Sequence, residues 1–383
     1  MCIWEDTSQT LRRAAPLHLL FARTLPCSLA FPQGSRCSTR TPLLPRGGAS
    51  AVTSDAGQTA PVRVVFMGTP EFAVPALERL LDAGFDVAGV YTQPDKPAGR
   101  GRQLTPSPVK ALALAKGLPV FQPPTLRKPP APEELAALKP EAIVVVAYGK
   151  LLPTEVLRIP PLGCVNVHPS LLPRHRGPSP IAGAILAGET ETGVTIMLLD
   201  EGMDTGPILA QVRTPLGPEE TAGQLGERLA RLGADMLPGV LTKLKQGWLT
   251  PQPQDNALAT VTRLVEKEEG ELDWRLSAEE LARRVRAYDP WPGTFTRWQG
   301  KVLKVLQVVA LSATDGGPPG TMVALEGAAS PVGVATGRGV LGLRRVQLEG
   351  RRAVTAQEFL QGARGFVGAV LPLPERKESG GAG

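Results

Sequence analysis

The stretch that decides the fold of this chain is Gly163-Cys164-Val165-Asn166-Val167-His168-Pro169-Ser170-Leu171-Leu172-Pro173-Arg174-His175-Arg176-Gly177. Its first part is short and apolar, which predicts a buried strand over 164–167. Side chains two residues apart share one face of a strand, so Asn166 and His168 are expected to emerge together. Proline and glycine follow at once, which places both side chains at the carboxyl end of the strand. Open α/β sheets bind their ligands at that edge.

Short apolar segments alternate with helical patterns before this stretch. Strands are predicted over 62–67, 85–91, 120–121 and 142–147, and helices over 108–116 and 132–138. This alternation is typical of an α/β fold with a doubly wound, mostly parallel, Rossmann-like sheet. Thr69 is the expected N-cap of the first helix. The evidence for a dinucleotide site is weak, because the second and third glycines of that fingerprint are missing.

Asn166 and His168 bring complementary chemistry to the predicted edge. An imidazole exchanges protons near neutral pH, and a carboxamide donates hydrogen bonds to a developing oxyanion. A carboxylate follows in Leu199-Asp200-Glu201-Gly202-Met203-Asp204-Thr205-Gly206, which joins two strands predicted to pair, 192–199 and 207–214. Asp204 is a candidate to orient His168, to stabilise its imidazolium or to take a proton through water. Asp200 and Glu201 are rival carboxylates on the same loop.

These motifs resemble those of the 10-formyltetrahydrofolate-dependent formyltransferases. The resemblance rests on Asn-x-His-x-Ser-Leu-Leu-Pro, starting at Asn166, and on Asp-Thr-Gly, starting at Asp204. It extends from about Val62 to about Phe366 and selects Asp204 over its rivals. It implies that Asn166 and His168 stabilise a tetrahedral oxyanion while Asp204 fixes the imidazolium. It also implies 10-formyltetrahydrofolate as the cosubstrate.

The resemblance further implies a folate site and a tRNA substrate. In the family, the folate binds at the loop that here contains Ser170, Leu171, Leu172 and Pro173, whose apolar side chains are suited to flank a pterin. The run Arg286-Ala287-Tyr288, followed by Pro290-Trp291-Pro292-Gly293, resembles the branch of the family that acts on methionyl-tRNA. The expected reaction is transfer of the formyl group to the α-amine of methionyl-tRNA.

A long basic segment separates Tyr91 from Val109. It is rich in proline and glycine, and unstructured loops of this length are either functional or disordered. It resembles the insertion with which the methionyl-tRNA branch grips the acceptor end of its tRNA. Lys96, Arg100 and Arg102 are the predicted phosphate contacts. The alternative is a solvated loop without a partner.

The pattern of the chain changes near its end. Short strands with turn signals are predicted over 302–311, 320–325, 333–336 and 340–346, which suggests a small OB-like β-barrel. Its predicted tRNA contacts are Arg344, Arg345, Arg351 and Arg352, although these arginines can equally form a solubilising surface. The predicted organisation is a leader (1–60), a catalytic domain (61–246), a linker (247–273), the barrel domain (274–373) and a disordered tail (374–383).

Composition sets broader limits. The chain has 383 residues, 42% hydrophobic content and a net charge of +6, which permits an anionic partner without requiring one. Three of its four cysteines lie in the leader, and Cys164 is expected to be a buried, inert thiol. His175 is the other available imidazole, with an expected packing or tRNA-facing role. No Cys/His cluster has metal-ligand spacing, and no run is long enough to span a membrane.

Residues 1–60 differ from the rest of the chain. Their basic residues are all arginine, hydroxyl groups are frequent and acids are few. This composition predicts a mitochondrial transit peptide and therefore a location in the mitochondrial matrix. The alternatives are a disordered tail or a secretory signal. The absence of a coiled-coil pattern favours a monomer.

Two alternative functions remain open at this stage. A formyltransferase acting on a small amine, such as glycinamide ribonucleotide or an amino sugar, shares the three catalytic residues but does not explain the basic insertion or the barrel. A catalytically inactive tRNA-binding relative explains the basic segments but not the intact Asn166, His168 and Asp204.

Overall fold

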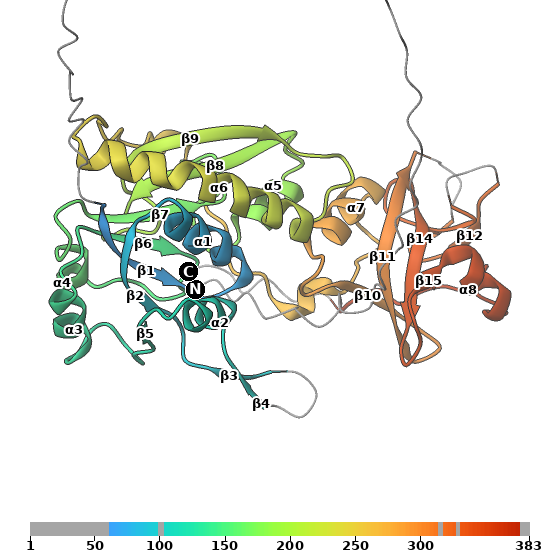
Figure 1. Ribbon diagram of the computed structural model, residues 1–383. Coiled ribbons are helices and arrows are strands. Elements are labelled where there is room, and N and C mark those ends of the chain that lie inside the picture. Colours follow the sequence, from blue (N-terminus) through green and yellow to red (C-terminus); the bar gives the residue numbers. More distant parts are fainter. Residues whose placement is uncertain (1–60, 99–102, 313–316, 327–329, 376–383) are drawn as a thin grey trace, which may run out of the picture. The chain divides into compact units, whose positions relative to one another are not determined.

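The computed structural model describes residues 61–98, 103–312, 317–326 and 330–375 (Figure 1). The predicted leader over 1–60, nearly all of the predicted tail and two predicted phosphate contacts, Arg100 and Arg102, lie outside these residues. Within the described ranges, no helix combines the length and the apolar character that crossing a membrane requires.

A seven-stranded sheet, in the order β5-β2-β1-β6-β7-β8-β9, forms the first half of the described chain (Figure 1). Its strands are β1 (Arg63–Gly68), β2 (Asp86–Tyr91), β5 (Val120–Phe121), β6 (Ala142–Val146), β7 (Cys164–His168), β8 (Glu191–Leu198) and β9 (Ile208–Pro215). The first five strands of this order pair in parallel, whereas β8 and β9 pair in antiparallel fashion. The mostly parallel sheet is therefore confirmed, and β7 lies where the parallel part ends.

Helices cover both faces of this sheet. On one face lie α1 (Val74–Asp82), α2 (Pro108–Ala115), α5 (Pro180–Leu186) and α6 (Ala222–Lys245), and on the other lie α3 (Ala131–Ala137) and α4 (Thr154–Leu157). Successive side chains of β1 point to the two faces of the sheet in turn. Val64 and Phe66 join the core under α1 and α6, while Val65 and Met67 join the core on the opposite face. Buried strands with two covered faces are apolar throughout, as these are.

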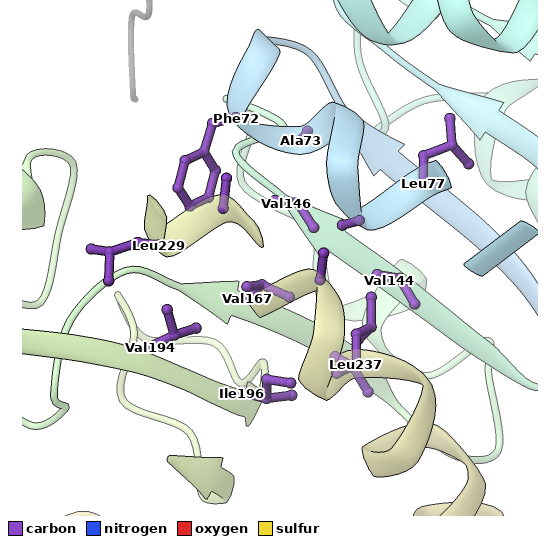
Figure 2. Packing of buried hydrophobic residues seen from close by; sticks show 14 of the residues in the cluster. Phe72, Ala73, Leu77, Val144, Val146, Val167, Val194, Ile196, Leu229 and Leu237 are labelled. Atoms are coloured by element: carbon purple, nitrogen blue, oxygen red, sulfur yellow. The ribbon is translucent and has the colours of Figure 1, made fainter. Parts of the chain in front are cut away.

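The larger core fixes β7 from one side. Leu77 of α1 and Leu237 of α6 are fully buried against Val144 of β6 and Val167 of β7 (Figure 2). Burial of each such aliphatic side chain contributes roughly 1.5–3 kcal/mol. Val167 lies between Asn166 and His168 and points to the opposite face of the sheet, so its packing holds the strand while its two neighbours face the other way.

The predicted helix cap at Thr69 is wrong. A 3-10 turn, η1 (Glu71–Ala73), precedes α1, and no side chain caps it. Thr69 Oγ1 instead donates to the carbonyl oxygen of Tyr148 at 3.1 Å and accepts from the backbone N–H of Gln93 at 3.2 Å. Thr69 therefore links loops at the edge of the sheet instead of capping the helix.

The basic insertion contains regular structure that its sequence did not predict. The strands β3 (Lys96–Ala98) and β4 (Gln103–Thr105) pair in antiparallel fashion as a two-stranded hairpin. Lys110 Nζ donates to Asp95 Oδ2 at 2.6 Å, and Gln122 Nε2 donates to Asp95 Oδ1 at 2.8 Å. These hydrogen bonds, from Lys110 first, lower the pKa of Asp95. The base of the hairpin is thereby anchored to the sheet.

The second half contains a six-stranded antiparallel sheet, in the order β10-β11-β14-β13-β12 with β15 paired to β14. The linker carries η2 (Asn256–Leu258) and η3 (Lys267–Gly270), and the later elements are α7 (Ala278–Ala287), β10 (Thr294–Trp298), β11 (Lys301–Leu311), β12 (Met322–Ala324), β13 (Val332–Ala335), β14 (Val340–Leu348), β15 (Val354–Thr355) and α8 (Ala356–Gly362). Among the described strands, β10 and β12 do not pair, so the predicted barrel takes the form of a curled sheet. Leu281 of α7 packs into the core of this sheet, whereas Tyr288 belongs to the core of the first half.

Candidate active site

Strand β7 delivers Asn166 and His168 to the carboxyl edge of the parallel sheet. Val165 and Val167 point into the core beneath α6, so Asn166 and His168 take the opposite face. Both are buried, with exposed fractions of 9% and 5%, and both line a cavity. No hydrogen bond joins the Asn166 side chain to the described residues, so its amide N–H groups are available to a bound carbonyl.

His168 is held through both ring nitrogens. Its Nε2 lies 3.0 Å from the carbonyl oxygen of His175, and its Nδ1 lies 3.6 Å from Asp204 Oδ2. A carbonyl oxygen can only accept, so Nε2 carries a proton in this arrangement. Nδ1 is therefore the nitrogen that faces the carboxylate. The distance of 3.6 Å is too long for a direct hydrogen bond but suits an ion pair with the imidazolium.

Asp204 lies in the loop between β8 and β9 in a strained backbone conformation. Its φ is 54°, in the left-handed region, and its side chain is 15% exposed. Oδ2 accepts a hydrogen bond of 2.8 Å from the backbone N–H of Gly177. Only glycine suits position 177, because its φ is 99° and a Cβ atom there would lie 2.6 Å from the carbonyl oxygen of Thr262. The carboxylate is thus fixed between a backbone donor and His168.

A cavity of about 950 Å³ opens beside these three residues. Its lining comes from segments far apart in the sequence: the turn after β6, the loop before β9, the start of α5 and the turn after α7. Lining residues besides the catalytic candidates include Gln93, Tyr148, Leu151, Leu152, Leu199, Met203, Ile181, Val265, Pro290 and Trp291. The volume is of the size that encloses a cofactor-sized ligand. Asn166, His168 and Asp204 are therefore brought together, as predicted, on one concave surface.

Tyr148 contributes an unpaired hydroxyl to this region. The residue is 1% exposed, and its hydroxyl has no hydrogen-bond partner among the described residues. Burial raises the pKa of Tyr148 to about 12, so the hydroxyl keeps its proton at neutral pH. The ring packs in the core with Val145 and Val156.

The predicted folate loop, Ser170 to Pro173, directly follows Pro169, which lines the cavity, and its part in folate binding stays a prediction. None of Ser170, Leu171, Leu172 and Pro173 lines the cavity, and both Ser170 and Leu172 are buried. Polar groups of the loop bond neighbouring backbone and strand β8: Ser170 Oγ donates to the carbonyl oxygen of Arg174 at 2.7 Å, and the N–H of Leu172 donates to Thr195 Oγ1 at 3.1 Å. These hydrogen bonds fix the course of the chain from His168 to His175.

His175 acts through its backbone rather than its ring. Its φ is 58°, and its carbonyl oxygen faces His168. The ring is buried and lies 3.2 Å from Glu189 Oε1, and burial lowers the pKa of His175. No sequence pattern signalled the backbone contact, because a carbonyl group is common to every residue. The N–H of Gly177 likewise left no signal in the sequence, although a glycine in this proline-rich loop indicated a turn.

The predicted tRNA contacts fall into different environments. Lys96 is exposed on the hairpin, and Arg345 and Arg351 are exposed on the second sheet. Arg344 Nη1 bonds Glu219 Oε1 at 2.8 Å, and Arg352 Nη2 lies 3.6 Å from Glu358 Oε1. The pairing of β11 with β14 shifts register at Gln307, which pairs with Arg345. The shift interrupts the alternation of buried and exposed side chains along β14, so neither Arg344 nor Arg345 is buried.

Cys164 is buried on β7, as expected, and burial raises the pKa of its thiol to about 12. Only the thiolate is nucleophilic, and its fraction stays low as pH rises through neutrality. We expect iodoacetamide at pH 8 to alkylate native Cys164 roughly a thousandfold more slowly than in the urea-unfolded chain. Peptide mass spectrometry of quenched time points measures both rates. Equal rates would show that the thiol is accessible and ionised.

Among the described residues, no group of three or more His, Cys, Asp or Glu side chains is placed to hold a metal ion.

Comparison with protein families gives two adjacent matches. Residues 62–241 match the model described as Formyl transferase, and residues 264–364 match the model described as Formyl transferase, C-terminal domain. A methionyl-tRNA formyltransferase from Chloroflexus aurantiacus is 52% identical over 301 residues, which cover 79% of this chain and 97% of that enzyme. The methionyl-tRNA formyltransferase from Marinobacter nauticus is 47% identical over 303 residues, covering 79% of this chain and 97% of the relative.

Solved structures share the fold at lower identity. An N-formyltransferase from Helicobacter canadensis, crystallised with folinic acid and dTDP-3-aminofucose, aligns with a TM-score of 0.55 at 18% identity, covering 76% of this chain and 100% of that one. HypX from Aquifex aeolicus aligns with a TM-score of 0.54 at 20% identity, covering 80% of this chain and 49% of that one.

Proposed function

This chain belongs to the formyl transferase family, and from that premise we propose that it transfers the formyl group of 10-formyltetrahydrofolate to the α-amine of methionyl-tRNA. One observation carries the proposal. Asn166, His168 and Asp204 meet at one cavity in a chain that is about half identical to methionyl-tRNA formyltransferases over nearly their whole length. The proposed site combines an amide donor, an imidazole and a carboxylate, which are the groups that acyl transfer to an amine requires.

The transfer forms one bond and breaks one. The neutral amine attacks the formyl carbon, the carbonyl oxygen takes up negative charge, and the bond to N10 of the folate then breaks. The amine loses one proton and N10 gains one, so no further reactant is needed. Asn166 donates to the developing oxyanion, and Nδ1 of protonated His168 adds a second donor. Asp204 stabilises the imidazolium at 3.6 Å and is close enough to relay the proton of the amine through water.

The cavity fits a folate and the end of an aminoacyl-tRNA together. Leu151, Leu152 and Val265 supply apolar walls of the kind that accept a flat ring, and Gln93 and Asp204 supply polar groups. Leu151 and Met203 are 70% and 52% exposed, so apolar side chains mark the entrance. We propose that the folate contacts residues 148–152 and the loop that follows His168, whose first residue, Pro169, lines the cavity.

The proposal is tested by incubating the purified chain with 10-formyltetrahydrofolate and three acceptors: methionyl-tRNA, glycinamide ribonucleotide and a nucleotide-linked amino sugar. Formylation of methionyl-tRNA alone is expected. Formylation of a small amine alone would replace the proposal with a small-amine transferase. Binding of tRNA without any formylation would instead identify an inactive relative.

Asp204 can be distinguished from its rivals by a matched pair of variants. We expect Asp204→Ala to lower kcat by roughly tenfold to a hundredfold, because the imidazolium loses its carboxylate. Glu201→Ala removes a rival carboxylate of the same loop, which also lines the cavity and accepts from Thr154 Oγ1 at 3.0 Å, and it is expected to lower kcat less than Asp204→Ala does. Steady-state formylation of methionyl-tRNA measures both, with thermal unfolding as the check on folding. A larger loss in Glu201→Ala would transfer the role to that residue.

We also propose that tRNA is contacted by Lys96 of the hairpin, by Arg100 and Arg102 of the same basic insertion, by Arg344 and Arg345 of β14, and by Arg351 and Arg352 between β14 and β15. Phosphate contacts release counterions, so the affinity for tRNA should fall steeply with salt. Replacement of Lys96 or Arg345 by alanine should reduce that slope without changing the KM for folate. An unchanged slope in both variants would exclude them from the interface.

We further propose that residues 1–60 direct the chain to the mitochondrial matrix, where it acts as a monomer without membrane attachment. The arginine-rich, acid-poor composition supports this location. A reporter fused to residues 1–60 should enter mitochondria, and a reporter with the leader arginines replaced by glutamine should not. Light scattering of the purified chain tests the monomer.

A further inference from the structure

The predicted linker is packed against both loops that hold the catalytic candidates. Gln252 exchanges two backbone hydrogen bonds with Ile208, each of 2.8 Å, just after the Asp204 loop. Further along, the N–H of Arg176 donates to the carbonyl oxygen of Thr260 at 2.9 Å, beside His175 and Gly177. The linker therefore crosses from one catalytic loop to the other.

Gln254 lies between these two attachment points, and its side chain uses every strong hydrogen-bonding position. Nε2 donates to the carbonyl oxygen of Asp204 at 2.8 Å and to that of Gly206 at 2.7 Å. Oε1 accepts from Nε and Nη2 of Arg176 at 3.1 and 2.9 Å. Arg176 is itself buried, with an exposed fraction of 7%, and also bonds Asn256 Oδ1. One amide group thus ties the Asp204 loop to the loop that carries His175.

The Asp204 loop requires stabilisation by residues outside it. Asp204 adopts a left-handed φ of 54°, which costs a non-glycine residue free energy and persists only where neighbours impose it. Residues 200–203 are exposed and supply little packing. The orientation of the Asp204 peptide decides where its side chain points, and its Oδ2 must lie near both Gly177 and His168. The two bonds from Gln254 to the carbonyl oxygens of Asp204 and Gly206 restrain that orientation.

We infer that Gln254 is a positioning residue for formyl transfer: its amide holds the backbone of Asp204 so that the carboxylate faces His168. The inference rests on the proposed function, because it concerns the same reaction. It gives the linker a part in the catalytic step beyond joining two halves of the chain. The competing explanation is structural, in which Gln254 merely docks the linker through Arg176.

Two substitutions separate these explanations. Gln254→Glu keeps oxygen acceptors for Arg176 and so preserves the docking, but it removes both N–H donors to the Asp204 loop. Gln254→Ala removes the donors and the acceptor together. Gln252→Ala is the matched control, because that glutamine is exposed and, within the part of the chain that the structure describes, its side chain bonds only the carbonyl oxygen of Thr250, at 3.1 Å.

The experiment measures kcat and KM with methionyl-tRNA, together with thermal unfolding, for the full chain and the three variants. We expect Gln254→Glu to unfold near the wild-type temperature while its kcat falls on the order of tenfold to a hundredfold. Its KM for methionyl-tRNA should stay within about threefold, because the change acts on turnover. Gln254→Ala should show at least the same loss of kcat, and Gln252→Ala should match the wild type.

Wild-type kcat in Gln254→Glu would overturn the inference, since docking alone would then suffice. Failure of both Gln254 variants to fold would overturn it as well, because it would assign the residue to stability. An inactive wild-type chain would reject the proposed function itself, whereas an active wild type with unaffected Gln254 variants would reject only the positioning role.

Discussion

His168→Ala is expected to lower kcat for formylation of methionyl-tRNA by roughly 10²–10⁴-fold, the range that a positioned general acid–base group supplies. The loss follows from geometry. Nδ1 lies 3.6 Å from Asp204 Oδ2, while Nε2 is held by the carbonyl oxygen of His175 at 3.0 Å. Alanine at this position removes both the second oxyanion donor and the partner of the carboxylate.

The measurement is single-turnover formylation with saturating folate, which reports chemistry apart from product release. The informative comparison is His175→Asn. Asparagine tolerates the left-handed backbone of that position and keeps the carbonyl group, so the loss should be far smaller than for His168→Ala. Comparable losses in the two variants would mean that the imidazole of His168 has no special part in the reaction.

Asn166→Ala is expected to lower kcat by roughly 10²–10³-fold, as removal of one oxyanion donor does in other acyl-transfer sites. The carboxamide lines the cavity and has no partner among the described residues, so its loss should not disturb the core. Thermal unfolding near the wild-type temperature is the expected companion result. The KM for methionyl-tRNA should change little, because the lost interaction strengthens only in the transition state.

Asn166→Asp sharpens the same test. Aspartate has nearly the same shape but presents acceptors where the amide presents donors, so it should be at least as impaired as alanine. Near-normal turnover by either variant would falsify the oxyanion role, and equal losses in kcat and affinity for folate would indicate a ground-state contact instead.

Much of the fold could be predicted from local patterns. The apolar run of β1 and the segment that ends at His168 identified buried parallel strands, since strands covered on both faces are apolar throughout. The paired strands around Asp204 followed from apolar segments joined by one polar, glycine-containing loop. The hairpin of the insertion was missed, because β3 and β4 are only three residues each and carry no alternating pattern.

The site residues were likewise predictable only in part. The spacing of Asn166 and His168 placed both on one face of β7, and the structure confirms that they meet Asp204 at a cavity. The resemblance assigned the loop from Ser170 to Pro173 to the folate, and this assignment stays a prediction, because Ser170 and Leu172 are buried and bond Thr195 while the adjoining Pro169 lines the cavity. Apolar loop residues look alike in sequence whether they line a cavity or fill a core.

The sequence by itself determined the alternation of strands and helices and the edge at which the ligand should bind, and it offered Asn166 and His168 as candidates there, whereas the resemblance singled out Asp204 from its rivals. The elements and the edge follow from local periodicity, because spacing along the chain fixes which side chains share a face. The candidate chemistry follows from the intrinsic reactivity of an imidazole and a carboxamide. Only the tertiary structure decided what holds those side chains in place: the carbonyl of His175, the N–H of Gly177 and the amide of Gln254. Backbone groups are the same in every residue, and the partner of a glutamine depends on which distant loop packs beside it, so neither leaves a mark in a local pattern.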